Sequence, residues 1–207
     1  MKNTIKKSIF SLVLVVVLLI ASILPASAAF DASLRESVGV IMPVLVHDDG
    51  QLTYQSYGTG FFVGNEGENP EYIVTNYHVI EFFIENWGNG EYTSFVTKNS
   101  AGEVTGRFTG HAQIRIYFDS TTFEQAYIVE ANESADLAVL RLDKPTNLRK
   151  AVRLAEPTEE MIGKTVYSLG YPGVADNNNY IPVSTWEITD AMVTNGVIGR
   201  ITTSSGT

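Results

Sequence analysis

An all-β fold is predicted by three features of the sequence. Residue types that are enriched in strands (Tyr, Phe, Val, Ile and Thr) recur throughout the chain. Turn signals that contain glycine, asparagine or proline separate short apolar segments, which is typical of strands joined by loops. Beyond the N-terminal segment no pattern predicts a helix long enough to organise a bundle, and no short fixed repeat occurs.

The first 28 residues have the features of a secretory signal peptide. Lys2, Lys6 and Lys7 form a basic start, the apolar run Ile9–Leu24 follows, and an Ala-Ser-Ala cleavage pattern comes directly after it. An uncleaved membrane anchor is the competing interpretation, but the run is short for a span of about 20 residues. We therefore expect cleavage near Ala28, a secreted or cell-surface protein, and no stable membrane insertion afterwards.

The composition of the remaining chain excludes several classes. Loss of the three signal-peptide lysines takes the formal net charge from −9 to −12, which argues against nucleic acid as a partner because such binding needs a basic surface. The absence of cysteine excludes disulfides and a lipoprotein anchor. The fold must therefore be stabilised by its own apolar core.

The N-terminal part of the mature chain is expected to form a short turn and then strands. Ser33–Glu36 has capping-box spacing and predicts one helical turn. The strand Val38–Val46 contains Pro43, which suggests an edge or a bulge. The hairpin signal Asp48–Gly50 leads to a strand that ends in Gly58–Val63, whose glycines indicate close backbone approach or a barrel corner.

Further strands follow as far as the end of the chain. After the strand Tyr72–Thr75, residues Val79–Trp87 are expected to be helical or irregular. A domain break is expected near residues 145–160, and the turn Gly170–Gly173 lies beyond it. The remaining strand candidates are Thr93–Thr97, Ala112–Phe118, Ala126–Glu130, Leu137–Leu142, Thr165–Leu169, Ile181–Ile188 and Met192–Thr203.

Two titratable residues at strand boundaries are the candidate catalytic groups. His78 follows a buried strand, which would hold it rigidly, and its near-neutral pKa range suits a general base. Asp136 stands before the apolar segment Leu137–Leu142. The competing interpretations are a hydrogen-bonded structural histidine and a solvated aspartate at the start of a strand.

The sequence around both residues resembles the trypsin-like serine proteases, nearest to the bacterial HtrA-type branch. Two motifs of that family, GSGF and ILTNxHV, are similar to the segments GTGFFVG and IVTNYHVI of this sequence, the second of which ends at Ile80. Asp136 begins a DLAVL motif. The resemblance spans Val38 to Ile201. It implies a trypsin-like double β-barrel with the active site between two six-stranded barrels. We expect a signal peptide over 1–28, a complete first barrel over 29–150, and a second barrel only begun over 151–207.

The resemblance also implies the roles of the two residues. His78 would be the base that takes a proton from a serine, and Asp136 would orient the imidazole. They are 58 residues apart, more than in compact family members, which fits an enlarged excursion from Trp87 to about Gly110. This chemistry needs neither a metal nor an organic cofactor.

The serine nucleophile is not found in the sequence. No GNSGG or GDSGG segment occurs, and Ser205-Gly206 is the nearest lookalike. The segment Val193–Ile198 resembles the family strand that precedes the serine turn with one more strand between them, so Ser205 comes too early. We expect the serine beyond Thr207, in a longer protein, and negligible peptidase activity for these residues alone.

The other polar clusters predict no site. His47 with Asp48 and Asp49 lacks a second pair at metal-ligand spacing and is interpreted as a polar hairpin turn. His111 is expected to start a strand. The polar cluster Asp176–Asn179 lacks calcium-loop spacing and is interpreted as a solvated loop. The cluster Asn132–Ser134 is interpreted as the polar segment before Asp136.

The sequence thus predicts a secreted serine endopeptidase that acts on proteins or peptides. The alternative is a catalytically inactive, protease-like binding or adhesion module, since one fold can host many functions.

Overall fold

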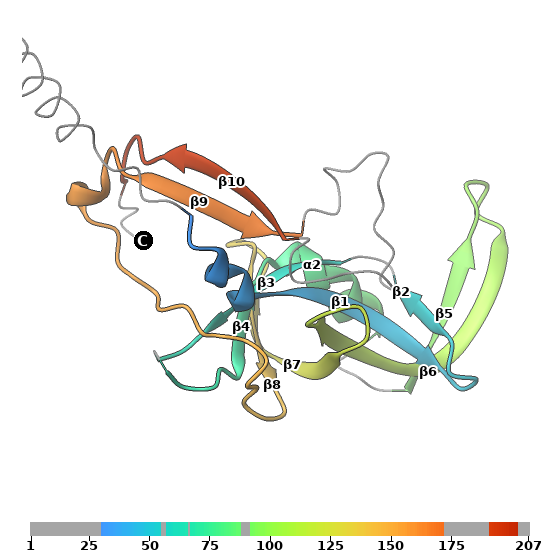
Figure 1. Ribbon diagram of the computed structural model, residues 1–207. Coiled ribbons are helices and arrows are strands. Elements are labelled where there is room, and N and C mark those ends of the chain that lie inside the picture. The colour runs from blue at the N-terminus through green and yellow to red at the C-terminus, as the bar shows by residue number, and fades with distance from the viewer. Residues whose placement is uncertain (1–29, 55–56, 66, 88–91, 172–190, 203–207) are drawn as a thin grey trace, which may run out of the picture. The chain divides into compact units, whose positions relative to one another are not determined.

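The computed structural model of the chain describes residues 30–54, 57–65, 67–87, 92–171 and 191–202, and strands dominate them (Figure 1). The helical elements are short: η1 (Ala32–Ser37), α2 (Tyr77–Phe82), η2 (Phe83–Trp87) and η3 (Glu159–Met161). The strands are β1 (Val38–His47), β2 (Leu52–Tyr54), β3 (Gly58–Val63), β4 (Tyr72–Thr75), β5 (Tyr92–Lys98), β6 (Val104–Tyr117), β7 (Phe123–Asn132), β8 (Leu137–Leu142), β9 (Thr165–Gly170) and β10 (Met192–Val197). The predicted all-β class is confirmed.

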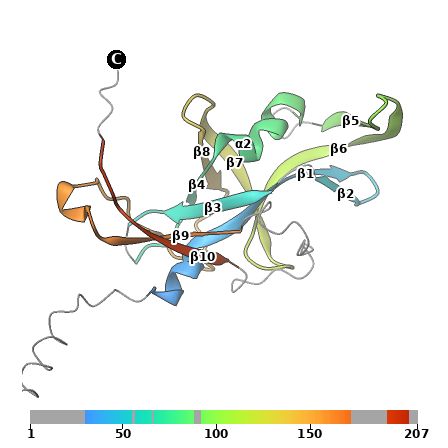
Figure 2. The same ribbon diagram turned by 90° about the horizontal axis from the view of Figure 1, so that it is seen from above.

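Six of these strands form a closed antiparallel ring. The large sheet has the order β2-β1-β3-β4-β8-β7-β6-β5, and an additional pairing of β1 with β6 closes β1, β3, β4, β8, β7 and β6 into a barrel. The hairpin of β5 and β6 extends beyond the ring in both views (Figures 1 and 2). The second sheet of the described residues consists of β9 and β10, which pair antiparallel.

The apolar sequence of β1 follows from the burial of both its faces. Ile41 and Leu45 enter the barrel core, whereas Val40, Met42 and Val44 contribute to a second buried cluster that also contains Tyr117, Tyr171 and Ala191. A strand covered on both sides reads as a continuous apolar run because neither face needs polar residues.

Pro43 does not mark an edge strand, contrary to one expectation. It lies opposite Ile114 of β6, inside the ring. On the other side of β1, the pairing with β3 covers Val38–Ile41 and the pairing with β2 covers Val44–Val46. Pro43 therefore stands where that side of β1 changes partner, which is a position that tolerates an interrupted ladder.

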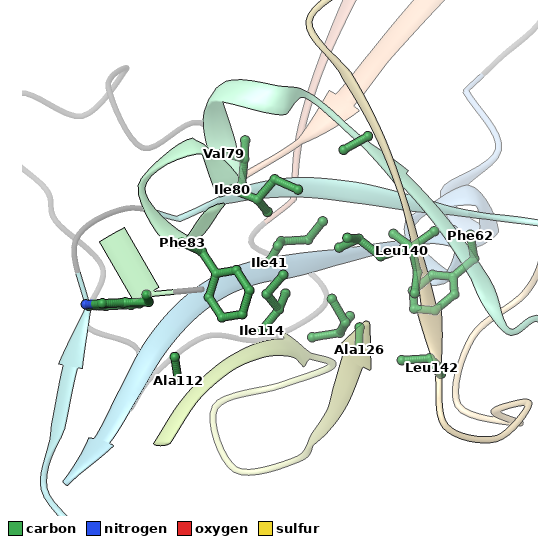
Figure 3. Packing of buried hydrophobic residues seen from close by; sticks show 14 of the residues in the cluster. Ile41, Phe62, Val79, Ile80, Phe83, Ala112, Ile114, Ala126, Leu140 and Leu142 are labelled. Atoms are coloured by element: carbon green, nitrogen blue, oxygen red, sulfur yellow. The ribbon is translucent and has the colours of Figure 1, made fainter. Parts of the chain in front are cut away.

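The barrel interior is packed by side chains from every strand of the ring and from α2 and η2. Figure 3 shows Ile41, Ile80, Phe83, Ile114 and Leu140 pointing toward one another. Burial of such a side chain stabilises the fold by about 1.5–3 kcal/mol. The core thus fixes α2, the helix that begins immediately after β4, against the barrel.

The paired glycines of β3 are required by close packing, as predicted. A Cβ atom on Gly60 would lie 2.5 Å from both Ile41 Cδ1 and Ile73 Cγ2, and one on Gly58 would lie 2.5 Å from Val79 Cγ2. Side chains at these two positions would push apart the strands and the helix that carry the candidate site.

Several predicted boundaries need correction. Ser33 is not an N-cap: Asp31 caps η1, and its Oδ1 accepts a hydrogen bond from Ser33 N at 2.9 Å. His111 lies within β6 and does not start it, because the excursion after Trp87 forms the β5–β6 hairpin. The strand predicted over Met192–Thr203 is β10, which ends at Val197. The predicted strand Ile181–Ile188 and the loop Asp176–Asn179 lie outside the described residues, as do the signal peptide and Ser205.

The turn between β6 and β7 is organised by the carboxylate of Asp119. Its Oδ1 accepts hydrogen bonds from the backbone N–H groups of Thr121 and Thr122, each at 2.8 Å, and from the Thr121 hydroxyl at 2.9 Å. The bonds from these two backbone N–H groups are the main cause that lowers the pKa of Asp119 to about 2. The ionised form is therefore the one that holds the turn.

We predict that Asp119→Asn makes the free energy of unfolding depend less steeply on pH between 5 and 2. A carboxyl whose pKa is lowered on folding contributes stability that is present above its ordinary value of 3.8 and is lost as the pH falls toward 2. Urea unfolding at several pH values between 5 and 2 measures this slope. The control is Asp143→Asn, because Asp143 is exposed and makes no hydrogen bond among the described residues. Equal slopes in the wild type and Asp119→Asn would contradict the assignment.

Candidate active site

His78 lies in the first turn of a helix. The sequence had suggested a position at the end of a strand. The strand β4 ends at Thr75, Asn76 is the N-cap with an extended backbone, and α2 begins at Tyr77. The next two residues of the helix, Val79 and Ile80, are buried in the core. The packed start of α2 therefore holds the backbone of His78 rigidly.

Asp136 lies in the turn that connects β7 to β8. The Asn132 side chain accepts a hydrogen bond from Ala135 N at 2.9 Å, and Asp136 N donates to Glu133 O at 3.0 Å. Asp136 itself has φ +48°, in the left-handed region, which aspartate adopts more readily than most residues. The polar segment before Asp136 is thus a turn that sets the direction of its carboxylate, which no spacing in the sequence revealed.

The structure brings the two predicted residues into direct contact. His78 Nδ1 lies 2.9 Å from Asp136 Oδ2 and 3.0 Å from Oδ1, and the backbone N–H of His78 donates to Oδ1 at 3.0 Å. Both side chains are accessible, with 65% of His78 and 47% of Asp136 exposed. A reactant can therefore reach the imidazole.

The hydrogen bonds keep the carboxylate ionised. The pKa of Asp136 is lowered chiefly by the hydrogen bond from the His78 backbone N–H, and then by the one from the His78 side chain. An ionised carboxylate at Nδ1 favours the imidazole tautomer that carries its proton there. In that tautomer Nε2 is an acceptor, and it has no hydrogen-bond partner among the residues that the structure describes.

A chain of hydrogen bonds connects the strands next to the site with Tyr171, the residue that follows β9. The buried hydroxyl of Thr75 donates to Thr59 O at 2.9 Å, and the Thr59 hydroxyl accepts from Tyr171 N at 2.6 Å. A Cβ atom on Gly170 would lie 2.7 Å from Thr59 Oγ1, so this approach requires glycine. Sequence reasoning missed Thr59, because a single threonine in a strand carries no signal of its own.

The other histidines make local contacts away from this pair. His47 Nε2 lies 2.7 Å from Thr53 Oγ1, and its ring packs against Phe108 with centroids 4.7 Å apart. His111 packs edge-on against Tyr92 at 5.2 Å. Within the described ranges, no three His, Cys, Asp or Glu residues gather as metal ligands would. The interpretation of His47 as part of a polar hairpin turn agrees with its hydrogen bond to β2.

Comparison with known families identifies the fold that presents this pair. The family model of the trypsin-like peptidase domain matches residues 58–207. The chain belongs to this family. The predicted resemblance to the trypsin-like proteases is thereby confirmed.

Two curated relatives show that the chain is similar to the Do-like, HtrA-type proteases. Protease Do-like 1, chloroplastic, of Arabidopsis thaliana is 28% identical over 119 residues, which are 57% of this chain and 20% of the relative. Protease Do-like 8, chloroplastic, of the same plant is 33% identical over 116 residues, 56% of this chain and 22% of the relative. The chain thus spans about a fifth of the length of these relatives.

Among solved structures, the crystal structure of Deg5 is 19% identical in sequence to this chain. The match covers 80% of this chain and 59% of the Deg5 chain, with a TM-score of 0.46. Separately, none of the helices in the described part of the chain has the length and apolar character needed to cross a membrane.

Proposed function

We propose that this protein is the catalytic part of a serine endopeptidase, with His78 as general base and Asp136 as the residue that orients it. One observation carries the proposal: His78 Nδ1 and Asp136 Oδ2 are 2.9 Å apart in a chain of the trypsin-like peptidase family. A binding module has no chemical need for an ionised carboxylate on Nδ1 of an accessible imidazole.

The geometry supports acyl transfer in two steps. His78 Nε2 takes the proton of a serine hydroxyl while the serine oxygen attacks the carbonyl carbon of the peptide bond, and it then gives that proton to the leaving amine. Asp136 stabilises the imidazolium that exists between these transfers. Water repeats the sequence to release the acid and restore the serine. Protein or peptide substrates follow from the family.

The nucleophile is proposed to come from outside these 207 residues. The sequence contains no Gly-x-Ser-Gly-Gly segment, which in this family supplies both the serine and the backbone donors for the oxyanion. We further propose that residues 1–28 direct export and are removed near Ala28, that 29–150 form the first barrel, and that 151–207 begin the second. These residues alone are then expected to have negligible activity.

The test is labelling of the native secreted protein with a fluorophosphonate probe, read by intact mass. The probe bonds only to a serine that a working base and oxyanion hole activate. The proposal expects a labelled species larger than residues 29–207 whose label is lost in His78→Ala. A folded full-length protein that takes no label would overturn it and favour the inactive binding module.

A further inference from the structure

Asn76 makes two hydrogen bonds to Asp136, and neither the family match nor the two catalytic assignments accounts for them. Its Nδ2 lies 3.2 Å from the carboxylate oxygen Oδ2 and 3.1 Å from the backbone oxygen of the same residue. Both partners are acceptors only, so the NH2 side of the carboxamide must face them. A single side chain thus holds the carboxylate and the main chain of Asp136 together.

Helix capping does not explain the presence of this asparagine. Asn76 is the N-cap of α2, where the side-chain oxygen ordinarily accepts a bond from the first helical turn. Here the side chain makes no capping hydrogen bond, although the Asn76 backbone oxygen accepts one from Val79 N at 3.3 Å. The carboxamide is directed instead across to the turn between β7 and β8.

Asp136 needs such support because its own surroundings fix it weakly. Its side chain is about half exposed, and its backbone is in the left-handed region. The backbone N–H of His78 donates to Oδ1, and His78 Nδ1 lies within hydrogen-bond distance of both carboxylate oxygens. Asn76 is the additional donor to Oδ2. Without that donor the carboxylate can rotate toward water and away from the plane of the imidazole.

We propose that Asn76 is a positioning residue that holds the Asp136 carboxylate in register with His78. This inference rests on the proposed function, because it assigns Asn76 a role in orienting that catalytic pair. In this role Asn76 acts through Asp136, to which its side chain donates both hydrogen bonds. The sequence word Thr-Asn-Tyr-His therefore contains two functional side chains, the base and, two residues earlier, the residue that fixes its partner.

Two substitutions separate positioning from a structural role. Asn76→Asp is isosteric and remains a strong N-cap residue, but it replaces the donor to Asp136 with a second negative charge. Asn76→Ala removes the side chain altogether. The matched control is Asn99→Asp, because Asn99 Nδ2 donates to Glu103 Oε2 at 2.8 Å in the β5–β6 hairpin, remote from His78 in sequence and on a different turn.

The experiment measures the rate of fluorophosphonate acylation of the full-length protein as a function of pH. In Asn76→Ala we expect a rate lower by about tenfold on the plateau, with the acid limb at lower pH, since the imidazolium loses part of its stabilisation. In Asn76→Asp we expect a similar or larger loss at neutral pH with the acid limb at higher pH, since the added charge favours the imidazolium. Asn99→Asp should acylate like the wild type.

Opposite displacements of the acid limb are not expected from a general loss of stability, which would lower both rates without moving it. If both Asn76 variants acylate with the wild-type profile while Asp136→Ala does not, the role of Asn76 is overturned and the proposed function stands. If His78→Ala and Asp136→Ala also acylate normally, the proposed function itself fails. Should Asn76→Ala fail to fold, Asn76→Asp alone still decides, because a wild-type profile in it overturns the inference.

Discussion

Replacing Asp136 by asparagine is expected to lower kcat of the full-length protein by about 10⁴-fold. The asparagine has the same shape, so the backbone N–H of His78 can still donate to its oxygen. The amide, however, carries no charge to stabilise the imidazolium, and its NH2 group can face Nδ1 only if the imidazole proton moves to Nε2. Nε2 is the nitrogen that must accept the serine proton, so the wrong tautomer blocks the first step.

Steady-state hydrolysis of a peptide substrate measures this effect. We expect kcat to fall and KM to change little, because the aspartate acts on the transition state and not on substrate binding. Asp143→Asn removes an exposed carboxylate of the segment after β8 and should leave both constants unchanged. A loss below about tenfold in Asp136→Asn would remove Asp136 from the mechanism, since orientation of the base by a carboxylate accounts for far more than that in triads of this kind.

The barrel was largely predictable because its strands are short apolar segments between strong turn signals. The signal Asp48–Gly50 became the β1–β2 hairpin, in which Gly50 has φ +83° and donates to His47 O at 2.9 Å. In the excursion after Trp87, the strand Thr93–Thr97 was predicted and corresponds to β5, but its pairing partner was not predicted. The excursion forms the β5–β6 hairpin because Tyr92–Lys98 can pair with the first half of β6, and sequence periodicity does not report that pairing.

The pair His78–Asp136 could be predicted, but the way it is held could not. Motif words identified both residues and implied that they meet, and the 2.9 Å contact agrees with that implication. The left-handed backbone of Asp136 and the amide of Asn76 depend on contacts between the β7–β8 turn and the start of α2. Those segments are about 60 residues apart in the sequence, and only the register of β4 with β8 brings them together.

A buried arginine was also invisible in the sequence, although the structure gives it a central place. Arg149 follows the segment after β8, and only 8% of it is exposed. Its Nε donates to Val38 O at 2.9 Å, and its other nitrogens donate to Leu148 O at 2.8 Å and to Phe118 O. Burial lowers the pKa of the guanidinium, yet an arginine remains charged in proteins. One side chain thus connects the start of β1, the end of β6 and the segment after β8.

We predict that Arg149→Met lowers the free energy of unfolding by about 3 kcal/mol or more. Methionine fills much of the same volume but donates no hydrogen bond, so three backbone oxygens lose a charged donor in a site that water reaches poorly. Arg149→Lys should recover only part of the loss, because an ammonium group cannot reproduce the planar fork that reaches three separate oxygens. Urea unfolding of the full-length protein at neutral pH measures both variants.

The neighbouring Lys150 provides the control that separates burial from charge. Its Nζ pairs with Glu36 Oε2 at 2.6 Å, but the two side chains are 65% and 43% exposed. An exposed ion pair contributes little to stability, so Lys150→Met should change the free energy of unfolding little although it removes the same charge from the next residue. Similar losses in the two methionine variants would mean that net charge, and not the three hydrogen bonds from Arg149 to backbone carbonyls, determines the contribution of this segment. The predicted difference would instead identify Arg149 as the residue through which the segment after β8 is fastened to the barrel.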